Sequence, residues 1–86
     1  MSAQAQRCPI QFLATEWGTQ PVRIVNWLVE KGETVMAGDV LVEIGLPGIL
    51  GDVRAATDGR VTDLCRIEDE WVTAETVLGW LEPSAE

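Results

Sequence analysis

Apolar residues in this chain occur in short runs, and turn-forming residues separate one run from the next. Residues 22–29 are rich in β-branched and aromatic side chains, which favour a strand. Gly32 and the pair Asp58-Gly59 indicate tight turns, since glycine reaches positive φ without steric cost. No window of about 11 residues has a helical period, so residues 16–21 are expected to form a loop. The expected strand segments are residues 9–15, 22–29, 35–36, 40–44, 52–56, 60–67, 71–72 and 77–81.

The chain also contains an internal repeat, in which residues 22–44 and 59–81 read as two copies of one unit. A shift of 37 positions places Ile24 on Val61, and further apolar residues coincide at the same shift. A unit this short cannot bury its own apolar face, so the copies are expected to pack as pseudo-symmetric halves of one core. Turns recur every six to twelve residues, and the predicted fold class is therefore an all-β sandwich or barrel.

A length of 86 residues suits one small domain, which we place at residues 9–82. Residues 1–8 and 83–86 are expected to be flexible segments. No apolar run approaches the roughly 20 residues of a membrane span, and the N-terminal residues are too polar for a signal peptide. A cytoplasmic location is the default expectation.

The formal charge is −8, from 14 acidic and 6 basic residues. Nucleic acids and anionic membranes both attract clustered Lys and Arg, so neither is an expected partner. A protein partner with a basic surface suits this charge, and a purely solubilising role is the alternative. A barrel with protected edges is expected to remain a monomer.

Residues with catalytic or metal-binding chemistry are few. The chain has no histidine, which excludes Ser/His and Cys/His nucleophilic pairs and zinc sites of the Cys/His type. Residues 68–70 are all acidic, but adjacent residues on a tight turn cannot all face one cation. We therefore predict no catalytic residue, no metal site and no enzymatic activity.

The two cysteines, Cys8 and Cys65, belong to no metal or redox motif. Cys65 aligns with Leu28 in the repeat, so we expect it to be a small core residue. A disulfide between the two cysteines, which would make the domain a redox element, is a weaker alternative.

Residues 27–44 resemble the first half of a lipoyl or biotinyl carrier domain. In that family a Gly-Asp turn, a short valine strand, a second Gly-Asp turn and a Leu-x-x-Ile strand follow in this order. Residues 55–61 are similar to the family's Ala-Pro-x-Asp-Gly-x-Val segment. The resemblance implies a flattened barrel of two four-stranded antiparallel sheets with quasi-two-fold symmetry. The matching positions of the first half are Gly32-Glu33, Val35, Gly38-Asp39, Leu41 and Ile44.

The second unit departs from this pattern at two turn positions. Asp69 stands where Gly32 stands in the first unit, and Glu75 stands where Gly38 stands. Aspartate tolerates left-handed backbone, so the first of these turns is expected to persist. Glu75 predicts a different local conformation at the second.

The resemblance also implies a protruding β-turn with a lysine that carries lipoate or biotin. When Ile44 and Asp58-Gly59 are aligned with the family without a gap, Gly48 takes the position of that lysine. No cofactor is then expected, because Gly48 has no amine. The only lysine in the chain is Lys31, in a turn of the first unit. An atypical carrier of lipoate or biotin on Lys31, serving an acyl- or carboxyl-transfer enzyme, is the alternative.

The segment between the two units, residues 45–51, is apolar and is the predicted functional site. It is read either as a knob that docks into a partner protein or as a hairpin that folds back over the barrel end. The docking interpretation makes the domain a non-catalytic interaction module. The residues predicted to bind the partner are Leu46, Pro47, Gly48, Ile49 and Leu50.

The four tryptophans are divided between core and interface. Trp27 is expected in the core and Trp80 at its rim. Trp17 and Trp71 are expected to help build the core of a small domain. The alternative is that either is an interface anchor, since tryptophan is enriched at binding hot spots.

Overall fold

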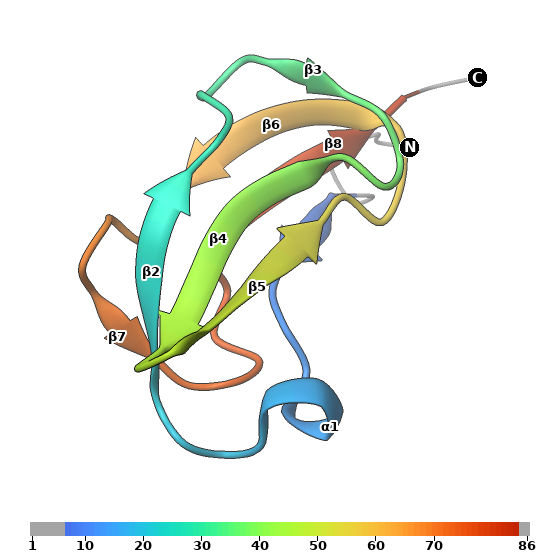
Figure 1. Ribbon diagram of the computed structural model, residues 1–86. Helices are drawn as coiled ribbons and strands as arrows, with labels where there is room; N and C mark the ends of the chain where they lie inside the picture. The colour runs from blue at the N-terminus through green and yellow to red at the C-terminus, as the bar shows by residue number, and fades with distance from the viewer. Residues whose placement is uncertain (1–6, 85–86) are drawn as a thin grey trace.

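A computed structural model describes residues 7–84 of the chain. Over this range the backbone forms eight strands and one short helix (Figure 1). The helix is α1 (Ala14–Trp17), and the strands are β1 (Cys8–Ile10), β2 (Val22–Trp27), β3 (Thr34–Val35), β4 (Val40–Leu46), β5 (Ile49–Arg54), β6 (Gly59–Leu64), β7 (Trp71–Val72) and β8 (Gly79–Pro83).

The strands form two antiparallel four-stranded sheets, with the orders β1-β8-β6-β3 and β5-β4-β2-β7. Figure 1 shows the two sheets curving around a common interior. No strand is common to both sheets, so the barrel is flattened and not closed. The predicted fold class, two four-stranded antiparallel sheets in a barrel-sandwich arrangement, is confirmed.

The internal repeat appears in the structure as a pseudo-two-fold relation between the sheets. Strands β2, β3 and β4 of the first unit correspond to β6, β7 and β8 of the second, and β5 corresponds to β1. Hydrogen bonds repeat with the same shift: Gly32 N donates to Val61 O at 2.7 Å, and Asp69 N donates to Ile24 O at 2.7 Å. The short strand of each unit pairs with the other unit, β3 with β6 and β7 with β2.

The core lies between the sheets and is entirely apolar among the residues that the structure describes. Repeat partners are buried together: Ile24 and Val61 are fully enclosed, because alternate residues of a strand face the same side. The predicted core residue Trp27 is half-buried at its edge, where its indole Nε1 donates to Arg66 O at 2.8 Å. The other buried members are Ile10, Phe12, Val22, Val29, Val35, Leu41, Val42, Ile44, Val53, Ala55, Val72, Leu78 and Leu81.

The prediction that Glu75 adopts a conformation unlike that of Gly38 is wrong. Gly38 has a φ of 93° and Glu75 a φ of 70°, so both residues are left-handed. Gly38 N donates to Ala55 O at 2.9 Å, and Glu75 N donates to Phe12 O at the same distance. This tertiary hydrogen bond holds Glu75 where its side chain alone would disfavour the backbone. The expected left-handed turn at Asp69, with a φ of 75°, is present.

Several element boundaries differ from the sequence prediction. Residues 14–17, expected to end a strand and begin a loop, form α1, in which Glu16 N and Trp17 N donate to Leu13 O. Strand β5 begins at Ile49, ahead of the expected residue 52, because it pairs with β4 up to the turn. The segment predicted as residues 1–8 contains the start of β1 at Cys8, and β8 extends to Pro83. Residues 1–6 and 85–86 lie outside the described part of the chain.

The left-handed backbone at Glu75 generates the first prediction. The Glu75→Gly variant should be more stable to urea by about 1 kcal/mol. A left-handed conformation costs a non-glycine residue about 1–2 kcal/mol, and glycine avoids this cost. Glycine also increases the conformational entropy of the unfolded chain, which offsets only part of the gain. The reciprocal Gly38→Glu variant should lose about as much, since no atom lies within 4 Å of a Cβ at Gly38 and backbone strain is the whole effect. A less stable Glu75→Gly variant would contradict this account.

Candidate functional site

The segment between the two units forms a tight hairpin. Leu46 of β4 pairs with Ile49 of β5, which leaves only Pro47 and Gly48 in the turn. Gly48 has a φ of 79°, a conformation that glycine adopts without cost, and no atom lies within 4 Å of a Cβ built on it. The tip of the hairpin is therefore open to solvent on the side of Gly48.

The apolar residues of this hairpin differ in burial. Leu46 is half-buried and packs against the core, whereas Ile49 is 56% exposed and Leu50 is 68% exposed. Pro47 and Gly48 are exposed as well. The hairpin therefore projects beyond the core, and Leu46 is the residue of the tip that packs against the core.

A straight row of residues crosses the outer face of the sheet at the base of the hairpin. Leu50 of β5 pairs with Gly45 of β4, Gly45 pairs with Arg23 of β2, and Arg23 pairs with Trp71 of β7. We call these four residues the Gly45 row. Neighbouring Ile24 and Ile44 are buried, so the strand alternation turns the Gly45 row outward.

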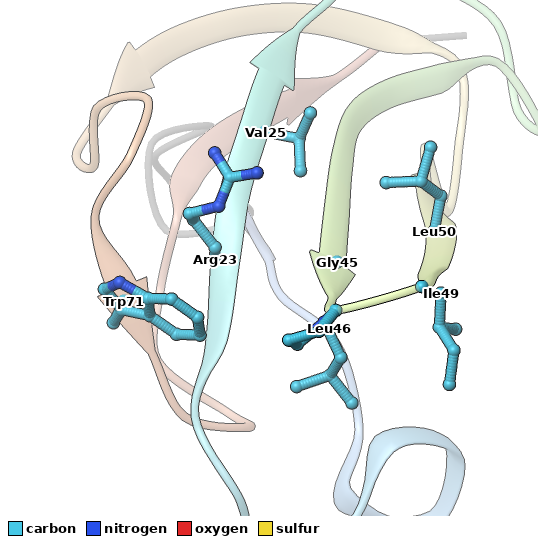
Figure 2. Close-up of a pocket in the computed structure, with 9 residues that line it drawn as sticks. Arg23, Val25, Gly45, Leu46, Ile49, Leu50 and Trp71 are labelled. Carbon is cyan, nitrogen blue, oxygen red and sulfur yellow. The ribbon is translucent and has the colours of Figure 1, made fainter.

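The Gly45 row forms the floor of a groove of about 490 Å³ (Figure 2). Gly45 is buried in the middle of the row, because a Cβ built there would lie 2.9 Å from both Leu50 Cδ2 and Ile49 O and 3.4 Å from Val25 Cγ2. Trp71, 56% exposed, stands at one side of the groove and the hairpin at the other. The residues that line the groove are Arg23, Val25, Gly45, Leu46, Pro47, Gly48, Ile49, Leu50 and Trp71.

The charge of Arg23 is balanced inside the domain. Its Nη1 lies 2.9 Å from Asp69 Oδ1, on the left-handed turn that precedes β7. The aliphatic part of Arg23 remains in the groove floor between Gly45 and Trp71, as long cationic side chains commonly cover apolar surface. The groove thus presents mainly apolar surface.

The second candidate anchor, Trp17, is placed differently. Its ring packs against Gly51 of β5 and against the core, and its centroid lies 6.4 Å from that of Phe12 in an edge-to-face arrangement. Trp17 also lines a smaller groove of about 310 Å³ on the other side of the hairpin, with Leu46 and Ile49. Trp17 therefore supports the hairpin, and only Trp71 stands beside the larger groove.

The sequence predicts the hairpin, including Gly45, but not the groove. The expectation that Trp71 helps to build the core is wrong, because its side chain is 56% exposed. Gly45, Arg23 and Trp71 lie on three strands from both units, and only the sheet register brings them together. The repeat contained a usable signal. The same shift that aligns the cores places Gly45 on Glu82 and Trp71 on Thr34, which are marked changes of side chain at outward positions.

Lys31 lies far from the hairpin. Strand β2 begins beside the tip, where Arg23 pairs with Gly45, and ends where Trp27 pairs with Val42. Lys31 follows the far end of β2, in the turn that leads to β3, and Figure 1 shows this turn and the β4–β5 hairpin at opposite ends of the sheet.

The prediction that Cys65 is a core residue is wrong, because its side chain is exposed. Its repeat partner Leu28 is itself 45% exposed, so the alignment transferred an exposed position and not a buried one. Cys8 pairs with Leu81 of β8, and β8 separates β1 from β6, after which Cys65 follows. Two strand spacings of about 4.8 Å exceed the reach of a disulfide, so the geometry excludes a Cys8–Cys65 bond.

The three acidic residues of the β6–β7 turn each have a separate partner. Asp69 binds Arg23, Glu70 Oε1 accepts from Ile67 N at 2.8 Å, and Glu68 Oε2 accepts from Trp27 N at 3.2 Å. Within residues 7–84 no three His, Cys, Asp or Glu side chains are grouped so as to hold a metal ion.

Comparison with known proteins agrees with this all-β fold. The biotin/lipoyl family, described as biotin-requiring enzyme, matches residues 11–81. The chain belongs to the biotin/lipoyl family. Members of this family carry covalently attached lipoate or biotin when the acceptor lysine is present. No curated protein matches the chain.

A solved structure of similar fold is that of the lipoyl domain of the 2-oxoglutarate dehydrogenase complex from Azotobacter vinelandii, determined in solution. It superposes with a TM-score of 0.67 at 23% identity, over 77% of this chain and 84% of that chain. This likeness shows that the biotin/lipoyl-family domain has the fold of a lipoyl domain. No helix within residues 7–84 is long and apolar enough to cross a membrane.

The contact of Trp17 with Gly51 generates the second prediction. A Cβ at Gly51 would overlap the Trp17 ring, so the Gly51→Ala variant must displace the ring and should lose about 1–3 kcal/mol in urea unfolding. In a Trp17→Ala background the same Gly51→Ala change should no longer destabilise, because the ring is absent and a glycine within a strand is itself about 0.5–1 kcal/mol less stable than alanine. Equal costs in both backgrounds would show that the ring does not restrict Gly51.

Proposed function

We propose that this biotin/lipoyl-family domain is a non-catalytic interaction module that binds a partner protein through the hairpin tip, Leu46 to Leu50. The observation that carries the proposal is the exposure of Ile49 and Leu50, at 56% and 68%, beside a core that is already complete. Large apolar side chains that gather on a protruding element are typical of protein-binding surfaces. The short Pro47-Gly48 turn orders the hairpin before binding, which lowers the entropic cost of association.

The composition of the tip supports a domain without an attached cofactor. Lipoate and biotin attach to a lysine amine, and residues 45–51 contain no lysine. In the gap-free alignment Gly48 takes the acceptor position, and the structure has Gly48 in the two-residue turn. The proposal therefore assigns neither a cofactor nor an enzymatic activity to this domain.

The charge of the chain supports a protein partner with a basic surface. The net charge of −8 repels nucleic acid and anionic lipid, and it draws cationic surfaces into encounter. It also opposes self-association, so we propose that the domain acts as a monomer. We further propose a cytoplasmic location.

The first test of this function is capture of a partner from the native host. The Ile49→Ser/Leu50→Ser variant should capture at least ten-fold less of the partner protein than the unmodified domain, because the exposed apolar contact is removed. Leu46 is left intact because it packs against the core. The matched control is Met36→Ser/Ile67→Ser, which removes two apolar side chains of similar exposure, 65% and 70%, at other sites. Equal retention by both variants would contradict docking through the tip.

The competing carrier function is tested by the intact mass of the protein purified from its native host. We expect the mass of the unmodified polypeptide. An added mass of a lipoyl or biotinyl amide that maps to Lys31, and that disappears in a Lys31→Arg variant, would replace the interaction module with a swinging-arm carrier.

A further inference from the structure

The two sheets share one backbone plan, so outer rows at equivalent positions can be compared residue by residue. The row equivalent to the Gly45 row consists of Thr34, Arg60 and Glu82, which pair across β3, β6 and β8. Arg60 Nη2 lies 3.6 Å from Glu82 Oε1, an ordinary cross-strand ion pair. In the tip-bearing sheet Gly45 replaces the glutamate and Trp71 replaces the threonine. The groove is thus a departure from symmetry.

We propose that the groove beside the hairpin binds an extended basic segment of the partner protein, with an apolar side chain between Trp71 and Leu50 and a Lys or Arg two residues along the segment near Glu43 and Glu68. The proposal deepens the proposed function and rests on it. It names the chemistry of the partner and adds the outer face of the sheet to the hairpin tip.

The apolar part of the groove has room for one large side chain. Leu50 and Trp71 lie at the two edges of the sheet, three strand spacings or about 14 Å apart. Gly45 and the stem of Arg23 lie between them, and Val25 closes the groove along β2. An aliphatic side chain from a partner would contact the Trp71 ring on one side and Leu50 on the other.

The next outward row is acidic. Asp52 of β5 pairs with Glu43 of β4, and Glu43 pairs with Asn26 of β2. The Asn26 side-chain amide lies 3.0 Å from Glu68 Oε2, which places a second carboxylate at this row. Outward rows two residues apart are about 6.6–6.8 Å apart, the same spacing as alternate side chains of an extended peptide. A segment with an apolar residue at one position and a basic one two residues later therefore matches both rows.

The ion pairs of the domain indicate the sign of the partner's charge. All five arginines already bind carboxylates of this chain, including Arg23 with Asp69 and Arg54 with Asp52. Over the described residues Glu43 and Glu68 have no ion-pair partner. An acidic segment would find no uncompensated cation in the groove, and a second copy would bring another net charge of −8.

The test uses the whole chain labelled with ¹⁵N and the synthetic peptide Ser-Thr-Leu-Thr-Lys-Thr-Lys-Ser, blocked at both ends. Titration to millimolar peptide should shift the amide signals of Gly45, Leu50 and Glu43 and the Trp71 indole signal. Peptides in which Leu is replaced by Ser, or both Lys by Glu, should bind at least five-fold more weakly. The absence of shifts in these signals would overturn the proposal.

Matched variants separate the groove from general electrostatics. Glu43→Gln/Glu68→Gln should raise the Kd of the peptide about five-fold, as expected when about 1 kcal/mol of exposed ion pairing is lost. Glu82→Gln removes one carboxylate from the equivalent row of the other sheet and should leave the Kd unchanged. A rise in Kd of about two-fold in the Glu82→Gln variant, the share of one charge against two, would mean attraction by net charge alone and would overturn the proposed site.

Failure of this inference is distinguishable from failure of the proposed function. If the tip variant loses the captured partner but the peptide does not bind, the interaction module stands and the basic segment is wrong. If sedimentation shows a dimer and Trp71→Ser dissociates it, a second copy occupies the groove and the proposal is overturned.

Discussion

The exchange of short strands between the two units is the constraint on which the rest of the structure depends. Strand β3 follows β2 in the chain but pairs with β6, and β7 follows β6 but pairs with β2. Each sheet thus obtains one of its four strands from the other unit, and neither unit can complete a sheet alone. Ile24 and Val61 are fully enclosed, and they lie on β2 and β6, the strands that pair with the exchanged strands. Folding of the halves is therefore coupled, as in a cooperative single domain.

This exchange also determines where the domain can present a protruding element. The pseudo-two-fold relation matches the β4–β5 pair with the β8–β1 pair. A two-residue turn connects β4 to β5, whereas β8 and β1 are distant in the chain and no turn joins them. Of these two equivalent strand pairs, only β4–β5 therefore ends in a connecting hairpin, and we call that end of the sheet the hairpin corner. Figure 1 shows this corner near β7, the strand that supplies Trp71 to the adjacent groove.

The hydrophobic repeat predicted the core and the fold class because repeat partners such as Ile24 and Val61 occupy equivalent inward positions. It failed at Cys65, since the alignment transfers a position and not its burial. It failed at Glu75 because a tertiary hydrogen bond to Phe12 O sets that backbone conformation. The four-residue helix α1 is shorter than any window that reveals a helical period.

The groove was beyond sequence analysis for a different reason. Gly45, Arg23 and Trp71 lie in one row only because of the register between β4 and β2 and between β2 and β7. Register between strands of different units depends on the strand exchange, which no local pattern predicts. The tip, in contrast, is contiguous in the chain, and its apolar character is visible without any knowledge of pairing.

The other sheet has Thr34 and Glu82 at the positions equivalent to Trp71 and Gly45, and a side chain is excluded only at Gly45, by the adjacent hairpin. A glycine within a strand costs about 0.5–1 kcal/mol, and an exposed tryptophan adds apolar surface that does nothing for the core. Trp71 therefore does not improve the stability of the isolated domain, whereas the packing of Ile49 and Leu50 requires glycine at position 45. Both residues line the apolar groove directly beside the exposed hairpin. A bound segment that covers this groove would account for the exposed Trp71, which is why the groove and the tip are best understood as one surface.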